Sequence, residues 1–213
     1  MDGTIVDTEP YWMDAEQALV AEWGGTWTHE QALELVGQGL WHSARILRAA
    51  GVGLAEDALV EALTATVIER IRVRVPWRPG AIELLTELRD LGVPTALVTM
   101  SLRSMAEVVV ESMGFPAFDV IVSGDDVQHA KPHPEPYLRA AELLGVEITE
   151  CVALEDSPTG LASAIESGAV AVGIPLMIDI PEHHTHTVWQ SLAGRTAADV
   201  AALYTTSTAG RTP

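Results

Sequence analysis

The feature that most constrains the fold of this chain is a series of short Val-rich runs that alternate with helical stretches after Gly80. The runs are TALVT, FDVIVS, CVAL and AVAVG, at residues 95–99, 118–123, 151–154 and 169–173. Apolar runs of this kind, separated by helices of about a dozen residues, are typical of a parallel sheet that helices cover on both faces. The sequence therefore predicts a doubly wound, Rossmann-like α/β core.

Residues 8–76 have a different pattern, with apolar side chains at helical spacing throughout. This spacing predicts four helices, at about residues 12–23, 31–36, 41–50 and 59–71. Pro76, Pro79 and Gly80 then interrupt the pattern. We therefore expect two units: a helical bundle at residues 8–76 and an α/β core made of residues 1–7 and 77–213.

The composition excludes several classes of partner. The chain has 30 acidic and 12 basic residues, a net charge of -18, which repels nucleic-acid phosphates and anionic lipid headgroups. Cys151 is the single cysteine, and the first residues lack the basic flank and apolar run of a signal peptide. No apolar stretch approaches the roughly 20 residues that span a bilayer. We expect a cytoplasmic protein, monomeric or a weak homodimer, that binds neither nucleic acid nor membrane.

Polar residues follow the first two predicted strands, at the sheet edge where doubly wound folds bind their ligands. Thr99 and Ser101 come after TALVT, where hydroxyls near a helix start favour an anion, although Ser101 is also an ordinary N-cap residue. Lys131 comes after FDVIVS, in AKPHPEPY, and is the only lysine of the chain. A compact ammonium between rigid prolines indicates a site residue, and a solvated loop lysine is the alternative.

Carboxylates mark two further places. Glu155 and Asp156 follow the third run, directly before Ser157 and Pro158, which begin the next helix. Adjacent carboxylates at a strand end suit Mg²⁺, and compensation of the helix dipole is the alternative reading. At the start of the chain, Asp2 precedes a Gly-Thr turn in MDGTIVD.

In this order, the segments MDGTIVD, VTMS, AKPHPEPY and LEDSPTG resemble the motifs of the haloacid dehalogenase superfamily of phosphatases and mutases. The resemblance covers almost the whole chain and implies that residues 8–76 form a cap domain. The family signature begins with D-x-D-G-T, and its first aspartate is the nucleophile at the end of the central strand. Met1 takes the middle position here, so neither that aspartate nor that strand is among the 213 residues. We expect the functional protein to begin further upstream; the alternative is a non-catalytic phosphate-binding protein that has lost its nucleophile.

The resemblance also assigns roles to the residues that match the motifs. The missing aspartate would form an aspartyl-phosphate, and Asp2 would act as general acid and base and join the metal shell. The residues that hold Mg²⁺ would be Asp2, Glu155 and Asp156. Those that bind and neutralise the phosphoryl group would be Thr99, Ser101 and Lys131.

The cap would select the substrate, a small-molecule phosphate ester, and we expect Trp12, Gln38 and Trp41 to contact it. The β-phosphoglucomutase branch of the family has a histidine at the position of Trp12, whereas the TEPYW stretch looks closer to sugar-phosphate and hexitol-phosphate phosphatases. We therefore expect a Mg²⁺-dependent phosphatase that acts on a phosphorylated sugar or polyol. The alternatives within this class are a sugar phosphomutase and a phosphoglycolate-type phosphatase.

The C-terminal part carries weaker signals. His183, His184 and His186 have the spacing of an adventitious metal site, in a predicted loop, and we do not expect a functional zinc site there. Residues 197–203 predict a final helix, and residues 205–213 a mobile tail.

Overall fold

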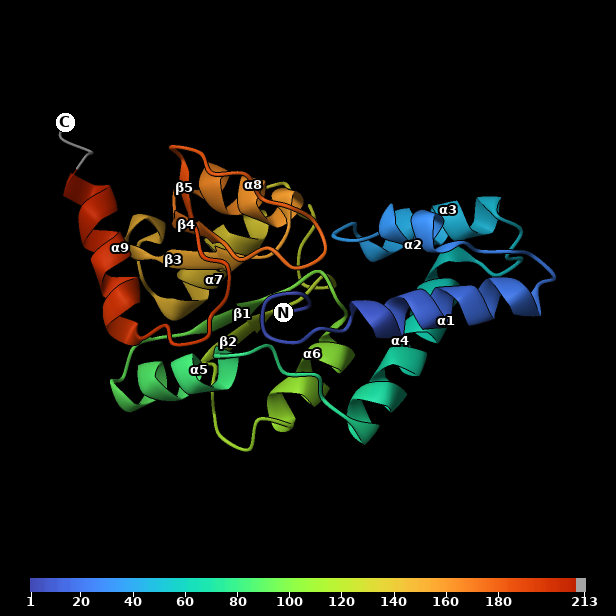
Figure 1. Ribbon diagram of the computed structural model, residues 1–213, viewed down its shortest axis with the longest axis horizontal. Helices are drawn as coiled ribbons and strands as arrows, with labels where there is room; N and C mark the ends of the chain where they lie inside the picture. The colour runs from blue at the N-terminus through green and yellow to red at the C-terminus, as the bar shows by residue number, and fades with distance from the viewer. Residues whose placement is uncertain (210–213) are drawn as a thin grey trace.

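The computed structural model describes the backbone of residues 1–209 and the side chains of residues 1–205. The first four helices correspond to the four predicted ones: α1 (Glu9–Glu22), α2 (His29–Leu33), α3 (Leu40–Ala49) and α4 (Glu56–Val73). These helices form a group beside the sheets (Figure 1), where α4 contacts both α1 and α3. The predicted i, i+4 stripe of α4 is buried, at Leu59, Leu63, Val67 and Ile71. This stripe is the apolar face on which the group packs.

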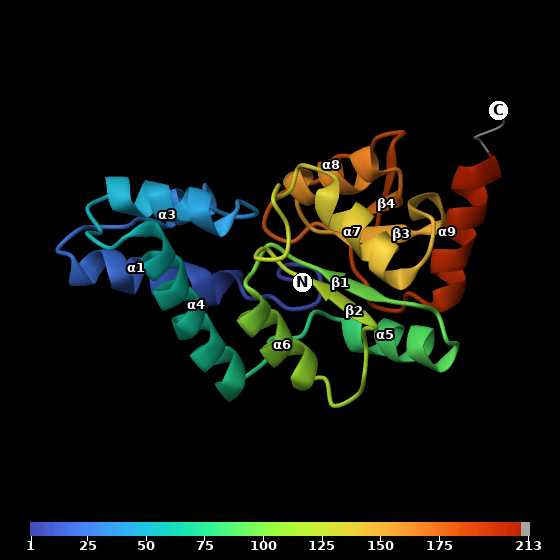
Figure 2. The same cartoon turned by 180° about the vertical axis from the view of Figure 1, so that it is seen from behind.

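The remaining helices alternate with the strands, as the sequence predicts. They are α5 (Ala81–Asp90), α6 (Arg103–Glu111), α7 (Glu135–Leu144), the short 3₁₀ helix η1 (Ile148–Glu150), α8 (Pro158–Ser167) and α9 (Ala197–Ala209). Figures 1 and 2 show α5 and α6 on one side of the strands and α7 and α8 on the other. The predicted α/β fold with helices on both faces is confirmed. In the part of the chain that the structure describes, no helix is long and apolar enough to cross a membrane.

All the pairings between strands are parallel. Strand β1 (Ala96–Val98) pairs with β2 (Val120–Val122), with Leu97 opposite Ile121. Strand β3 (Val152–Glu155) pairs with β4 (Val170–Gly173), which also pairs with β5 (His186–Val188). The first four are the predicted strands. Strand β5 lies where the sequence predicts a loop, because its three half-buried residues His-Thr-Val carry no apolar run and pair only at the free edge of β4.

The strands form two sheets within residues 1–209, of order β1-β2 and β3-β4-β5, rather than one continuous sheet. A cavity of about 500 Å³ lies between them, and residues 95–98 and 151–154 both line it, with Met1 and Ile5. The strands β1 and β3 therefore face each other across an apolar space instead of exchanging hydrogen bonds. The N-terminal turn lies beside this space and also reaches the carboxyl ends of the strands.

The end of the chain differs from the prediction. Helix α9 extends to Ala209, so residues 205–209 are helical and not part of a tail. The run of Thr and Ser at 205–208 offered no apolar periodicity from which to extend the helix. The rest of the predicted tail, residues 210–213, lies outside the described residues.

Candidate functional site

A second cavity, of about 110 Å³, opens at the carboxyl ends of β1 and β3, between the strands and the helices α1 to α3. The structure brings six of the predicted site residues together here. They come from four segments that are far apart in the sequence, and all line this cavity: Asp2, Thr99, Ser101, Lys131, Glu155 and Asp156. The carboxyl ends of parallel strands meet at one edge of the fold, which is why the motifs converge.

The N-terminal turn wraps closely around Asp156. The backbone N–H of Ile5 donates to the carbonyl oxygen of Met1 at 2.8 Å, and the Thr4 hydroxyl donates to Asp156 Oδ1 at 3.2 Å. Gly3 has a φ of +67°, and a Cβ atom at this position would lie 1.9 Å from Asp156 Oδ2. Only glycine fits a positive φ and so close an approach, which explains the glycine of the DGT motif.

Hydroxyl groups and an indole orient Asp2. Its Oδ2 accepts hydrogen bonds from Ser101 Oγ at 2.7 Å and from Thr99 Oγ1 at 3.5 Å. Its Oδ1 accepts from Thr8 Oγ1 at 2.5 Å and from Trp12 Nε1 at 3.4 Å. Asp2 thus joins the end of β1 to the first turn of α1, so that a group reacting at this carboxylate would face both the α/β core and the helical segment.

Lys131 and Glu155 form a buried ion pair. Lys131 Nζ lies 2.5 Å from Glu155 Oε1, and the two side chains are only 10% and 6% exposed. Lys131 Nζ also donates to the carbonyl oxygen of Val98 at 3.1 Å. The hydroxyl of Tyr137 donates to the same Glu155 oxygen, and burial together with the Glu155 charge raises the pKa of Tyr137 well above its usual value. Tyr137 therefore remains a hydrogen-bond donor at neutral pH.

The contacts of Glu155 bear on its predicted role as a metal ligand. The resemblance implies that Glu155 holds the metal, but its Oε1 is bound by Lys131 and Tyr137. Its Oε2 faces Gly160, where a Cβ atom would lie only 2.0 Å away. The geometry favours Glu155 as the residue that positions Lys131, because its carboxylate already has a cationic partner.

Asp156, in contrast, lacks a cationic partner among the ion pairs of residues 1–205. Burial, followed by the charge of Glu155, raises the pKa of Asp156 to about 6. Burial, Asp2 and Asp156 together raise the pKa of Glu9, which lines the same cavity, to about 8. Carboxylates this close to one another need a positive charge. The oxygen atoms of Asp2 and Asp156 fit a hard cation such as Mg²⁺.

Arg78 holds the N-terminal turn in place, a role that the sequence motifs did not predict. Its buried guanidinium donates to the carbonyl oxygen of Gly3, to that of Ile174 at 3.2 Å and to that of Pro175 at 3.2 Å. A signal was present in the sequence, since an arginine inside the Pro-Trp-Arg-Pro-Gly connection is fixed by prolines on either side. Its carbonyl partners come from segments that only the fold brings together.

The residues predicted to contact the substrate from the helical segment divide into two groups. Trp12 and Gln38 line the cavity. Trp41 is not among the lining residues, because its indole N–H donates to Asp57 Oδ1 at 2.8 Å, which ties α3 to α4. Glu16, on α1, also lines the cavity, although the sequence motifs did not predict it as a site residue.

Glu16 is buried beneath the cavity. Trp27 Nε1 donates to Glu16 Oε2 at 3.2 Å, and burial raises the pKa of Glu16 to about 7. Its position four residues after Trp12, on the buried face of the helix, was the signal in the sequence.

The histidines at 183, 184 and 186 are not brought together as ligands. Within the described residues, the only group of three potential ligand side chains is His129, His133 and Glu135. That no functional zinc site forms at these histidines remains a prediction.

Comparison with known proteins identifies similar sequences over most of the chain. A family model described as haloacid dehalogenase-like hydrolase matches residues 1–168. Hexitol phosphatase B of Escherichia coli (strain K12) is 29% identical over 179 residues, which are 82% of this chain and 81% of that protein. Fructose-1-phosphate phosphatase YqaB of the same organism is 30% identical over 179 residues, 83% and 94% of the two chains. Hexitol phosphatase A is 36% identical over 127 residues, which are 60% of this chain and only 57% of that protein.

Solved structures share the fold. CbbY from Rhodobacter sphaeroides, solved in complex with phosphate, has a TM-score of 0.85 and 28% identity, covering 94% of this chain and 96% of its own. A β-phosphoglucomutase from Clostridium difficile has a TM-score of 0.82 at 21% identity and covers 98% and 96%. At that lower identity, the likeness concerns the fold alone.

Proposed function

Because the chain belongs to the haloacid dehalogenase-like hydrolases, we propose that it hydrolyses the phosphate monoester of a small sugar or polyol. The observation that carries this proposal is the convergence of six predicted side chains on one cavity. The relatives named as phosphatases of hexitol phosphates and of fructose 1-phosphate support this substrate class.

Lys131 is the residue that would bind the phosphoryl group. An ammonium has three N–H donors, and Glu155 and the Val98 carbonyl take two of them. The third donor has only a long contact, 3.5 Å, to the Tyr137 hydroxyl, which a phosphate oxygen can replace, while Glu155 fixes where the ammonium lies. The hydroxyls of Thr99 and Ser101 would donate to other phosphate oxygens and so stabilise the charge of the transition state.

Asp2 would donate a proton to the leaving oxygen of the substrate and later take one from water. Asp2 and Asp156 would hold Mg²⁺, which when bound neutralises charge on the phosphate and the carboxylates. Trp12, Gln38 and the carboxyl groups of Glu9 and Glu16 line the side of the cavity that belongs to residues 8–76. We assign this helical segment the role of a cap, whose carboxyl and amide groups accept hydrogen bonds from the hydroxyls of a sugar or polyol.

The nucleophile in this mechanism is an aspartate directly before Met1, which would form an aspartyl-phosphate that water then hydrolyses. Two observations support that placement. Met1 lines both the cavity of about 110 Å³ that holds the six site residues, hereafter the catalytic cavity, and the apolar cavity between the sheets. This apolar cavity, at about 500 Å³, is bordered by the unpaired edges of β1 and β3 and can accept an apolar strand leading to that aspartate.

The substrate class is tested by phosphate release from hexitol phosphates, fructose 1-phosphate, phosphoglycolate and β-glucose 1-phosphate, each with Mg²⁺ and with EDTA. The protein assayed contains the aspartate before Met1, and its Asp2→Asn variant is the control. We expect release from the sugar and polyol phosphates, lost with EDTA and in the variant. Equal release with EDTA, or a preference for phosphoglycolate, would contradict the proposal.

A further inference from the structure

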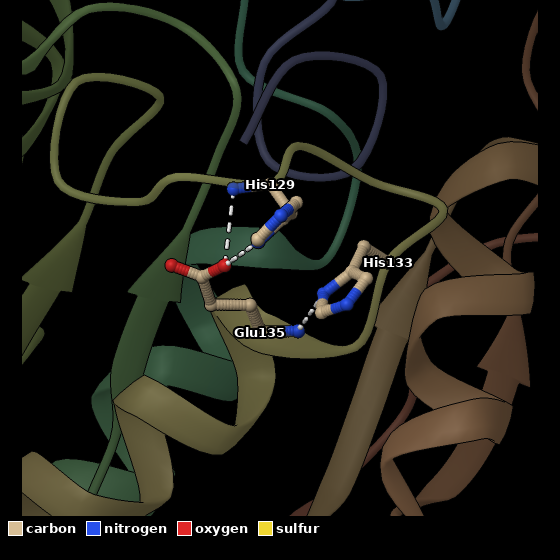
Figure 3. A group of neighbouring side chains, drawn as sticks. All are labelled: His129, His133 and Glu135. Atoms are coloured by element: carbon tan, nitrogen blue, oxygen red, sulfur yellow. Dashed lines mark hydrogen bonds and ion pairs between the residues drawn. The ribbon is translucent and has the colours of Figure 1, made fainter.

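The loop between β2 and α7, together with the first residue of α7, carries a cluster of potential metal ligands outside the catalytic cavity. One nitrogen each of His129 and His133 and one carboxylate oxygen of Glu135 all lie within 4.8 Å of one another. Figure 3 shows the two imidazole rings side by side, with the carboxylate of Glu135 directed at His129. The ring centroids are 4.5 Å apart. None of these residues lines the catalytic cavity.

Backbone contacts preorganise the carboxylate. Glu135 Oε1 accepts the N–H of Gln128 at 2.7 Å, and Oε2 accepts the N–H of His129 at 3.0 Å. These bonds keep the pKa of Glu135 below its usual value. Each carboxylate oxygen has two lone pairs, so Oε1 keeps one for a further partner. The anchored carboxylate is thus available as a ligand without a rearrangement of the loop.

The same contacts define the state of the imidazoles. His129 Nδ1 lies 2.6 Å from Glu135 Oε2, and because a carboxylate only accepts, this nitrogen carries the proton. A dication between the two side chains would replace this proton, so that Nδ1 and the Glu135 carboxylate both face the ion. His133 Nδ1 accepts the N–H of Glu135 at 3.2 Å, a long bond that a metal ion can replace.

We propose that His129, His133 and Glu135 form a binding site for a transition-metal dication such as Zn²⁺, and that the ion fastens the loop segment that carries Lys131. Two imidazoles and one carboxylate are a ligand set that Zn²⁺ takes, with water in its remaining position. Mg²⁺ prefers oxygen ligands throughout, so this site and the Asp2–Asp156 site select different ions. Tetrahedral ligands about 2.1 Å from zinc lie about 3.4 Å apart. The ligand atoms here lie within 4.8 Å of one another, so the side chains would adjust to bind the ion.

The consequence for Lys131 follows from its place in the chain. Lys131 lies between the two histidines, and its backbone N–H donates to Met100 Sδ at 3.4 Å. The carbonyl oxygen of His133 accepts a hydrogen bond from Ser163 Oγ, at 2.7 Å, which joins the far side of the loop to α8. A metal ion that bridges His129, His133 and Glu135 would close the segment on both sides of the lysine.

Isothermal titration with Zn²⁺, with Mg²⁺ in excess to occupy the catalytic site, tests the proposal. The test variant is His129→Asn with His133→Asn, and the matched control is His183→Asn with His186→Asn, which removes the same number of imidazoles from the other histidine cluster. We expect one Zn²⁺ per chain in the wild type and the control. Affinity should be weaker by at least about 100-fold in the test variant, because loss of a partner outside the ligand set already costs about 10 to 100-fold. Equal affinity in the test variant, or loss only in the control, would overturn the proposal.

Hydrogen exchange of the backbone amides provides a second readout, which depends neither on phosphatase activity nor on a folding defect of one variant. Zn²⁺ should slow the exchange of amides in residues 128–135 of the wild type. In the His129→Asn, His133→Asn variant, Zn²⁺ should leave the exchange rate of those amides unchanged. Exchange in the rest of the chain should be equal in the wild type and the variant. Binding of Zn²⁺ without protection of this segment would contradict the role assigned to the ion.

Discussion

Lys131 is held by a contact that stabilises the fold as well as the site. Removal of one partner from a buried ion pair leaves the other charge without compensation, which costs about 3–5 kcal/mol. The Lys131→Ala variant should lose on the order of this free energy of unfolding in urea titrations, because Glu155 is only 6% exposed. The double variant Lys131→Ala with Glu155→Gln should regain part of it. In both variants kcat/KM should fall at least about a hundredfold, because the charge that binds the phosphoryl group is lost.

The exposed pair of Arg139 and Glu142 provides the control for Lys131. These side chains are 46% and 68% exposed, and exposed pairs contribute about 0–1 kcal/mol. Arg139→Ala should therefore change the free energy of unfolding by less than about 1 kcal/mol. Equal losses in Arg139→Ala and Lys131→Ala would show that the buried pair lacks the role given to it.

Gly160 lies in the first turn of α8 and leaves room for Glu155. An alanine Cβ there would lie 2.0 Å from Glu155 Oε2. The Gly160→Ala variant should therefore unfold more easily, by about 1–3 kcal/mol, even though alanine favours helices. Gly39→Ala is the matched control, since a Cβ at Gly39 would meet no atom within 4 Å. Thermal unfolding of both variants decides the point, and an unchanged or higher Tm for Gly160→Ala would be the contrary result.

Helix α1 places an acidic side chain where an apolar one would pack, which makes the stability of the protein depend on pH. Burial raises the pKa of Glu16 from 4.5 to about 7. Between these values the unfolded chain releases a proton that the folded chain keeps, so the free energy of unfolding decreases as the pH rises from about 4.5 to about 7. The loss amounts to at most on the order of 3 kcal/mol.

The Glu16→Gln variant removes this titration. It should flatten the decrease over that pH range and be more stable than the wild type at pH values above the Glu16 pKa, as urea unfolding at a series of pH values would show. Glu22→Gln, an exposed substitution on the same helix, is the control and should follow the wild-type curve. A Glu16→Gln curve parallel to that of the wild type would contradict the burial of this carboxyl group.

At the scale of helices and strands, the sequence predicts much of the fold. Runs of Val and Ala between helices led to strands β1 to β4, because buried parallel strands need continuous apolar residues. Strand β5 could not be predicted, since it depends on hydrogen bonds to β4 and not on its own residues. In the site, the motifs identify the residues that converge, but not their partners. The contacts of Glu155 with Lys131 and Tyr137, and of Trp41 with Asp57, depend on side-chain directions that only the packed helices determine.

At the scale of the whole molecule, residues 1–209 form two sheets with an apolar cavity between them and a group of helices that closes the site at one end (Figure 1). The edges of β1 and β3 border the cavity without pairing with each other. Backbone groups left unpaired in an apolar interior cost about 1–3 kcal/mol each. A strand inserted between them would satisfy these groups, and its last residue would lie beside Met1, at the catalytic cavity.

The most direct measurement is phosphate release from a hexitol phosphate, with Mg²⁺, by three proteins: the 213-residue chain, the chain preceded by an apolar strand ending in aspartate, and the same extension ending in asparagine. The two extensions fill the cavity alike and differ only in the proposed nucleophile. We predict release by the aspartate form alone. Equal release by the asparagine form or the 213-residue chain, or none from a folded aspartate form, would contradict a phosphatase that acts through an aspartate at this position.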